Sequence, residues 1–464
     1  MVQIEKIKIN SHPIFENKII DFKVFDDVKN TYTLIIGQNG CGKSELLRII
    51  TDSTNSQIIE RESNGRVSVA TDGIVVFKDS FLPKKVIASS FSLNDKFPIL
   101  TSRNKLFHKN YEYLGIRSTT NNAFIGKYKK EFLSKLTKIL SDKKRTDSFK
   151  NALVMLDMPT IFKFSFKYGK GMRDVINSLS EVNSYEDFSE DVNQYIEKNS
   201  NSQRLNAKKY INKLNSGYFK SEIFKFFSSE NKNLDSLEYD IDLSNPSLNE
   251  LFLEDSTILN ELISSNVIKI NDFSFVTDMN YSFSVASSGQ YHIFTEILNI
   301  SSSVIDYSII LIDEPEISLH PNWQVKYIEI LQNILDDYTG CQVIICSHSH
   351  FLVSNIDSKF CSVMKAKKDN YNDVNVTVYE QDVYGWSPEQ VLYNVFGMTS
   401  TRNHYFEADL KKVVSIISKV NLKIEEIHEP LNRLKLFNIT EDDPLKILID
   451  KADDFISEAN DVSA

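Results

Sequence analysis

The sequence has few cysteines and no long apolar run. Its four cysteines in 464 residues are too sparse for a disulfide framework, and none stands in a CxxC zinc pattern. No stretch reaches the roughly 18 uncharged apolar residues of a membrane span. The alternating first nine residues lack the apolar core of a secretory signal. We therefore expect a cytoplasmic protein that does not act at a membrane.

The chain also lacks a positive charge balance. Its 53 Lys and Arg residues are outnumbered by 63 Asp and Glu residues, which gives a formal net charge of −10. This balance argues against a globally basic nucleic-acid binder, although local basic patches can coexist with an acidic total. The hydrophobic fraction of 41% and the charged fraction of 25% are ordinary for a soluble globular protein. The length predicts two or three structural units.

Short apolar runs predict a buried parallel sheet, and hence an α/β fold. A β-rich run at 32–36 leads into a glycine loop and an apolar helix, and further runs occupy 86–88, 309–312 and 343–345. The stretch between these halves is rich in Lys, Asn, Ser and Phe, with helical spacing at 128–140. We predict a head made of residues 1–101 and 264–376, a mostly helical insertion at 102–263, and a helical C-terminal appendage at 377–464.

Basic residues cluster in the predicted insertion. They are Lys129, Lys130, Lys135, Lys138, Lys143, Lys144 and Arg145, followed by Lys208, Lys209, Lys213, Lys220 and Lys225 among the aromatic residues Tyr210, Tyr218 and Phe219. Such a mixture could hold phosphates by charge and bases by stacking. A solvated helix face with ordinary aromatic packing explains it equally simply, and we favour that interpretation.

One glycine loop carries a phosphate-binding pattern. It reads Gly37-Gln38-Asn39-Gly40-Cys41-Gly42-Lys43-Ser44, follows the predicted strand and precedes the predicted helix, and so matches G-x-x-x-x-G-K-[ST] at every fixed position. Phosphates need backbone N–H groups at close range, and the glycines leave room for that approach. Lys43 is expected to bind the terminal phosphates, and Ser44 is expected to bind Mg²⁺.

The apolar run at 309–312 ends in two carboxylates, Asp313 and Glu314. Ligands of parallel sheets bind at the carboxyl ends of the strands, so these side chains should lie near the phosphates. Asp313 is expected to hold the hydrated Mg²⁺. Glu314 is expected to orient and polarise the water that attacks the γ-phosphate.

Two further segments complete the pattern. Ser287, Ser288, Gly289 and Gln290 stand just before an apolar-rich helix and offer hydroxyls and a helix N-terminus to an anion. The run at 343–345 leads into His348, which could reach a γ-phosphate. A structural histidine or an exposed serine turn would explain either segment alone. Their order around Asp313 favours a shared site.

At these residues the chain resembles the ABC-type ATPase heads of SMC, RecF and OLD-like proteins. Ser287-Ser288-Gly289-Gln290 resembles the ABC signature, with Ser288 where glycine is usual, and His348 is similar to the switch histidine. The run Glu314-Pro315-Glu316-Ile317-Ser318-Leu319-His320-Pro321 is similar to the E-P-E-x-x-L-H-P segment of that group. Residues 92–98, 113–115 and 386–392 look like those of anti-phage ATPases such as Septu and PARIS.

The resemblance implies an ATP- and Mg²⁺-dependent ATPase whose two copies sandwich nucleotide, one giving the P-loop and the other the signature. Asn94 or Asp95 would then contact the metal or the attacking water. The insertion is too short for the long coiled-coil arm of SMC proteins.

We find no His-Asn-His cluster, acidic Toprim domain or compact D…E-x-K arrangement, so a nuclease or toxin effector is expected to be separately encoded. The rival hypothesis is a DNA-repair or maintenance ATPase that binds DNA through the insertion lysines. A transporter ATPase is disfavoured by the large insertion between Lys43 and Asp313.

Overall fold

The computed structural model describes residues 1–67, 69–99, 110–117, 124–169, 185–186, 189–190, 193–194, 221–222, 224–226, 237–264, 268–276, 281–353, 356–368, 373–383, 385–396, 403–418, 424–436 and 444–463. These residues divide into two compact units, 1–385 and 386–464. The lysines and aromatic residues at 208–220, considered above as a possible nucleic-acid surface, lie outside the described residues, and so do the side chains of Lys129 and Lys130. None of the helices described is long and apolar enough to cross a bilayer.

The first unit is built on a seven-stranded sheet of order β14-β13-β3-β12-β11-β5-β6, parallel except for the antiparallel edge strand β14. The strands are β3 (Thr31–Gly37), β5 (Lys85–Ser90), β6 (Tyr111–Tyr113), β11 (Ser308–Asp313), β12 (Gln342–Ser347), β13 (Cys361–Lys368) and β14 (Val374–Val378). Every residue of β3, β11 and β12 is buried, as expected for central parallel strands covered on both faces. The predicted α/β fold is therefore confirmed.

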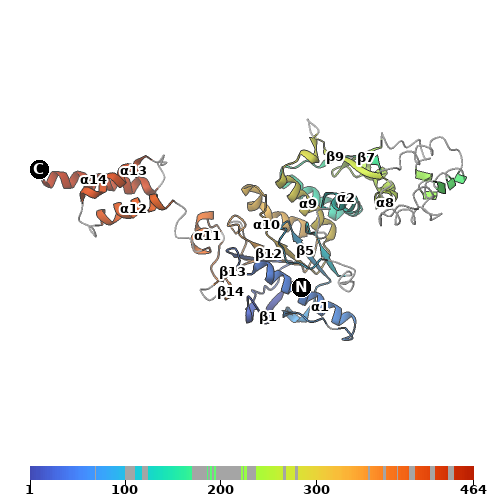
Figure 1. The fold of residues 1–464 in the computed structure, drawn as a ribbon, viewed down its shortest axis with the longest axis horizontal. Coiled ribbons are helices and arrows are strands. Elements are labelled where there is room, and N and C mark those ends of the chain that lie inside the picture. Colours follow the sequence, from blue (N-terminus) through green and yellow to red (C-terminus); the bar gives the residue numbers. More distant parts are fainter. Residues whose placement is uncertain are drawn as a thin grey trace. The chain divides into compact units, whose positions relative to one another are not determined.

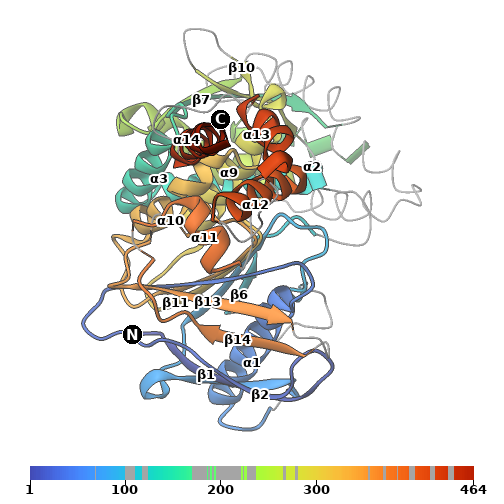
Figure 2. The same cartoon turned by 90° about the vertical axis from the view of Figure 1, so that its left-hand side faces the viewer.

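One face of this sheet is covered by helix α1 (Lys43–Glu62). A small antiparallel sheet of order β2-β1-β4 packs on the other side of α1, and its strands are β1 (Ile4–His12), β2 (Glu16–Asp21) and β4 (Gly73–Phe77). Figure 2 shows α1 between β1 and the large sheet. The main apolar core fills both sides of this helix.

Helices gather on the other side of the large sheet (Figure 1). They are α2 (Phe124–Leu140), α3 (Lys143–Met155), α9 (Ser288–Ser303) and α10 (Pro321–Leu335), with α8 (Glu250–Ser264) packed on α2. A four-stranded antiparallel sheet of order β10-β9-β7-β8 adjoins them. Its strands are β7 (Ile161–Tyr168), β8 (Glu238–Asp242), β9 (Ile268–Phe275) and β10 (Tyr281–Ser282). Buried phenylalanines join this sheet to the helices, among them Phe132, Phe162, Phe164, Phe273 and Phe294.

This second sheet changes the layout predicted for the insertion. Strands β7 and β8 lie inside the predicted 102–263 segment, whereas β9, which pairs with β7, lies after it. Strand β6 also lies within 102–263 but belongs to the large sheet. The apolar pattern of β7 is local, whereas its partner β9 lies about a hundred residues later along the chain. Residue spacing alone therefore did not reveal this pairing.

The second unit, residues 386–464, is helical. Its helices are α11 (Pro388–Asn394), α12 (His404–Ile417), α13 (His428–Lys435) and α14 (Pro444–Ser463). A small core of its own joins α12, α13 and α14, with Val413, Leu434 and Ala452 at its centre. Among the described residues of both units, short 3-10 turns occur at η1 (Lys78–Ser80), η5 (Pro246–Asn249), η6 (Phe283–Val285) and η7 (Ile424–Ile427).

Candidate nucleotide site

Three adjacent strands, β3, β12 and β11, end at one edge of the large sheet and deliver the predicted phosphate groups there. The P-loop follows β3, His348 follows β12, and Asp313 ends β11. Carboxyl ends of neighbouring parallel strands meet in space, so motifs that lie some 300 residues apart in sequence become neighbours.

The P-loop depends on two of its glycines for shape. A Cβ at Gly37 would lie 2.2 Å from the Ala366 carbonyl oxygen on β13, which leaves no room for a side chain. Gly42 has φ +76°, a left-handed conformation that other residues rarely adopt, and helix α1 begins directly after it. Gln38, Asn39 and Gly40 form the exposed crest of the loop. The α1 N-terminus therefore opens onto the loop, as phosphate binding requires.

Lys43 is folded back into the loop. Its ammonium Nζ donates to the carbonyl oxygens of Gly37 at 3.0 Å and Gln38 at 3.2 Å. It also lies 2.9 Å from Nε2 of His348. The same imidazole nitrogen is 3.4 Å from Oε1 of Glu314. Three of the predicted groups, Lys43, His348 and Glu314, thus converge on one point.

The surroundings of His348 favour its neutral form. Burial lowers the pKa of His348, and the neighbouring Lys43 ammonium lowers this pKa further, while Glu314 opposes both. A neutral imidazole can accept a hydrogen bond from Lys43 and donate one elsewhere. His348 is therefore suited to touch a phosphate oxygen as a donor.

Asp313 has the surroundings of a magnesium ligand. Its side chain is 1% exposed and hydrogen-bonded to the Ser44 side chain, and burial raises the pKa of Asp313 to about 7, with Glu314 and Asp95 adding to the rise. Within the described residues its Oδ1 has no hydrogen-bond partner. An unpartnered buried carboxylate oxygen is costly unless a cation or donor binds it. Asp313 and Ser44 therefore fit a hydrated Mg²⁺, whose oxygen ligands they would provide.

Glu314 stands in a strained backbone conformation. Its φ is +52°, uncommon for a non-glycine residue, and its N–H donates to the Cys346 carbonyl at 2.9 Å. This turn directs the chain away from β11 and leaves the carboxylate beside His348. Asp313 and Glu314, though adjacent, thus take different places in the site.

The signature-like segment, residues 287–290, lies on a different surface from the P-loop. Ser287 caps helix α9 through a capping box, in which its hydroxyl accepts from the Gln290 N–H at 3.2 Å and the Gln290 side chain accepts from the Ser287 N–H at 2.9 Å. A Cβ on Gly289 would lie 2.5 Å from the Ser318 carbonyl oxygen. Ser287 and Ser288 are exposed beside a hollow of about 900 Å³ whose walls include Asp157, His320 and Trp323. No residue of the P-loop lines this hollow.

The two candidates for contacting metal or water, Asn94 and Asp95, have different surroundings, and their role stays a prediction. Asp95 is buried and accepts from Arg117 at 2.6 and 2.8 Å and from the Tyr113 hydroxyl at 2.7 Å. Its carboxylate is thus engaged by the chain just before α2. Asn94 is exposed, and its backbone N–H donates to the Ser92 hydroxyl. Asp95 acts on Asp313 through its charge, which raises the pKa of Asp313.

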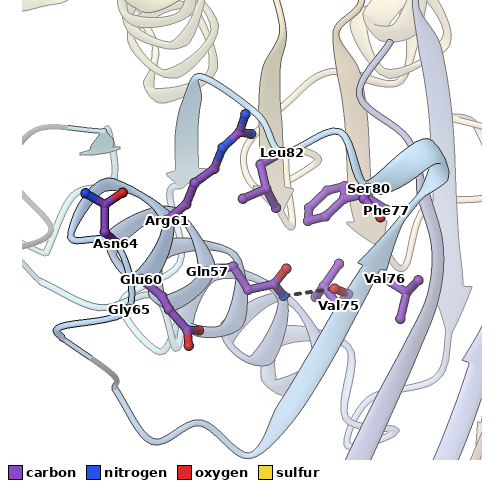
Figure 3. A pocket seen from close by; sticks show the side chains of 10 residues that line it. All are labelled: Gln57, Glu60, Arg61, Asn64, Gly65, Val75, Val76, Phe77, Ser80 and Leu82. Atoms are coloured by element: carbon purple, nitrogen blue, oxygen red, sulfur yellow. Dashed lines mark hydrogen bonds between the residues drawn. The ribbon is translucent and has the colours of Figure 1, made fainter.

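Another hollow, of about 600 Å³, lies at the far end of α1 (Figure 3). Val75, Phe77 and Leu82 give it an apolar side, and Gln57 donates to the Val75 carbonyl at 2.8 Å. The helix rises 1.5 Å per residue, so Gln57 lies roughly 20 Å from Lys43 along α1. This hollow is therefore separate from the nucleotide site.

Sequence reasoning missed two carboxylates near the site. Glu316 accepts a hydrogen bond from the His348 N–H at 2.5 Å. Glu296 on α9 is 1% exposed, and its Oε1 accepts from the Ser89 hydroxyl at 3.2 Å. Its Oε2 faces Nε2 of His292 at 3.6 Å. The sequence shows Glu316 in the Glu-Pro-Glu run and His292 four residues before Glu296. It does not show that the two carboxylates are buried.

The buried Glu296 should make stability depend on pH. Burial raises the pKa of Glu296 to about 7 from 4.5, so the folded chain keeps this proton at a pH where the unfolded chain has lost it. The stability that the protonated Glu296 contributes is fully present below pH 4.5 and is lost as pH rises to about 7. As pH rises across this window, the free energy of unfolding of Glu296→Gln should therefore increase relative to that of the wild type by up to about 3 kcal/mol.

Thermal unfolding of both proteins between pH 4 and 8 tests this expectation. Burial lowers the pKa of His292 to about 4, so this histidine gives the opposite slope and is present in both proteins. The difference between the curves therefore reports the loss of the Glu296 carboxylate, together with any change that this loss causes in its neighbour His292 at 3.6 Å. The exposed Glu254→Gln is the control for losing one carboxylate at the surface. A difference that stays constant with pH would contradict the assignment.

Comparison with known proteins agrees with this geometry. Residues 3–353 match the AAA ATPase domain family (AAA_15). A stretch of 134 residues is 32% identical to the Septu protein PtuA of Bacillus thuringiensis, and it covers 28% of this chain and 33% of that protein. The chain thus matches about a third of the length of this curated relative.

Two solved structures of SMC heads align with much of the chain. The Smc head domain of Pyrococcus furiosus, bound to the C-terminal domain of ScpA, aligns over 82% of this chain and 96% of its own, with 10% identity and a TM-score of 0.31. An Smc head bound to the C-terminal winged-helix domain of ScpA aligns over 81% and 97%, with 12% identity and the same TM-score. Since the family match at 3–353 spans most of the chain and contains every site residue described above, the chain belongs to the AAA ATPase domain family.

Proposed function

We propose that this chain is an ABC-type ATPase that hydrolyses ATP between two copies of itself and thereby controls a separately encoded nuclease or toxin in anti-phage defence. The observation that carries the proposal is that the groups predicted to bind nucleotide are divided between two surfaces. Lys43, Asp313, Glu314 and His348 converge at one sheet edge, whereas Ser287 opens onto another hollow. The similarity to a Septu protein supports the defence role.

Each group has a task in this proposal. The P-loop N–H groups and Lys43 bind the β- and γ-phosphates, and Ser44 and Asp313 hold Mg²⁺, which neutralises phosphate charge when bound. Glu314 orients and polarises the attacking water. His348 donates to a γ-phosphate oxygen. Ser287 and the α9 N-terminus of the second copy complete the phosphate contacts.

The rival hypothesis is DNA binding through insertion lysines. Two of the basic side chains that it relies on make hydrogen bonds within the protein instead. Arg145 is buried and donates to the Ser301 and Val304 carbonyls, at 2.5 and 2.7 Å, and Lys135 donates to Asn299 at 2.7 Å. Lys143 and Lys144 remain exposed at the start of α3.

Copurification with the products of neighbouring genes tests the proposal. We expect the chain to copurify with a nuclease or toxin, and phage plating to fall when both proteins are present with Glu314 intact. Glu314→Gln should abolish this protection while keeping the complex. Protection by the chain without a partner would contradict the proposal. So would tight duplex binding that weakens steeply with salt and is lost in Lys143→Ala/Lys144→Ala, which would support the rival.

A further inference from the structure

The segment that carries His348 turns sharply after β12. Its own serines hold part of this turn, since the Ser347 hydroxyl accepts from the Ser349 N–H at 2.8 Å and the Ser349 hydroxyl accepts from the Phe351 N–H at 3.1 Å. These bonds are local and tie the turn to itself. They do not determine where the turn lies relative to β11, where Glu314 stands.

Two side chains from the β11 side fix that position. Glu316 Oε1 accepts from the His348 N–H at 2.5 Å, and the Ser347 side chain is hydrogen-bonded to the same carboxylate. Gln324 on α10 accepts from the Ser349 hydroxyl at 2.5 Å, and its amide donates to the Leu319 carbonyl at 2.9 Å. The segment after β12 is therefore held at consecutive positions by the segment that follows Glu314.

The burial and incomplete hydrogen bonding of the Glu316 carboxylate indicate a role beyond filling space. Its Oε2 is buried and, among the described residues, has no hydrogen-bond partner. Burial raises the pKa of Glu316, and the nearby Glu314 raises this pKa further. Keeping such a group is costly, because an apolar residue would avoid both the desolvation and the repulsion. Its bond to the His348 backbone is the contact that links this group to the nucleotide site.

We propose that Glu316 is a positioning residue for hydrolysis, which holds the His348 backbone so that the imidazole stands between Lys43 and Glu314. This inference rests on the proposed role of His348 in the ATPase site. Glu316 itself touches neither the phosphates nor the attacking water. Its contribution is to fix the distance between the segments that follow β11 and β12.

Steady-state ATP hydrolysis by four variants tests the inference. Glu316→Ala should lower kcat about 10- to 100-fold, as is typical when a residue that orients an active group is removed. The KM for ATP should change little, because the P-loop is untouched. Glu316→Gln should keep most of the activity, since its amide oxygen accepts the same bonds. The double variant Glu316→Ala/His348→Ala should be no slower than His348→Ala, because Glu316 acts through His348.

Controls separate this role from general stability. Glu329→Ala removes an exposed carboxylate from the same helix as Gln324 and should leave kcat unchanged. An independent readout is the imidazole of His348, followed by NMR without nucleotide and identified by its absence in His348→Ala. Burial and Lys43 lower the pKa of His348, so this pKa should rise toward its ordinary range in Glu316→Ala but not in Glu316→Gln.

The possible outcomes point to different errors. Additive losses in the double variant, with an unmoved histidine pKa, would overturn the positioning role and leave the proposed function intact. Wild-type turnover in His348→Ala would overturn both the role of His348 and the inference built on it. If the wild type hydrolyses no ATP, the proposed function fails, and the histidine titration still decides whether Glu316 holds His348.

Discussion

Lys43→Ala is expected to abolish ATP binding. The ammonium is the main fixed positive charge that the loop can offer to the terminal phosphates, and its removal also deprives His348 of its nearest cation. A hydrogen bond to a charged group contributes about 1.5 to 3 kcal/mol, and Lys43 would make at least two to the phosphates, so affinity should fall more than about 100-fold.

Calorimetric titration with ATP and Mg²⁺ measures this loss. Lys8→Ala is a matched control, because Lys8 is an exposed lysine on β1. Lys43 also lowers the pKa of His348, so Lys43→Ala should raise that pKa even without nucleotide. Near-wild-type affinity in Lys43→Ala would show that the phosphates bind elsewhere.

The second large effect concerns assembly. Glu314→Gln keeps the shape of the side chain but loses the charge that polarises water, so this variant should bind ATP without hydrolysing it. ATP should then hold two copies together in a stable dimer. ADP lacks the γ-phosphate that the Ser287 surface of the other copy would contact, and it should dimerise the variant far less.

Adding Ser287→Arg to Glu314→Gln should prevent the dimer, because Ser287 is exposed and a bulky cation there would obstruct the facing surface. The double variant should still bind ATP as a monomer, since its own P-loop is unchanged. Light scattering with ATP and with ADP measures the molecular mass of Glu314→Gln and of the double variant. A monomer in every condition for Glu314→Gln would refute the sandwich.

A constant larger mass would require a different assay. Closure within a preformed assembly can be detected by a disulfide between Gln38→Cys and Ser288→Cys that forms with ATP and not with ADP. Both positions are exposed, whereas the four native cysteines are buried and should not compete.

The local features of the site were predictable because each motif is continuous in sequence. The P-loop, the carboxylates after β11 and the histidine after β12 all follow apolar strands, and an apolar run that ends in polar residues is readable by eye. The family resemblance and the α/β fold are both confirmed. The catalytic and metal roles stay predictions.

Features that depend on pairing across the chain were not predictable from one sequence. Nothing in the local pattern shows that Asp95 meets Arg117, or that β3 lies between β12 and β13. One missed signal was available: Phe162, Phe164 and Phe166 alternate with polar residues and mark the strand β7 inside a segment predicted to be mostly helical. The Lys-rich and Asn-rich surroundings obscured this period of two.

The position of β3 has a consequence for synthesis in the cell. Both of its neighbours, β12 and β13, are made about 300 residues later, which at ~5 to 20 residues per second takes roughly 15 to 60 s. Until then the P-loop strand has two unsatisfied edges and an apolar surface that invites aggregation. The nascent chain should therefore need shielding by a chaperone, and truncated translation products that stop before β12 should be insoluble and unable to retain nucleotide.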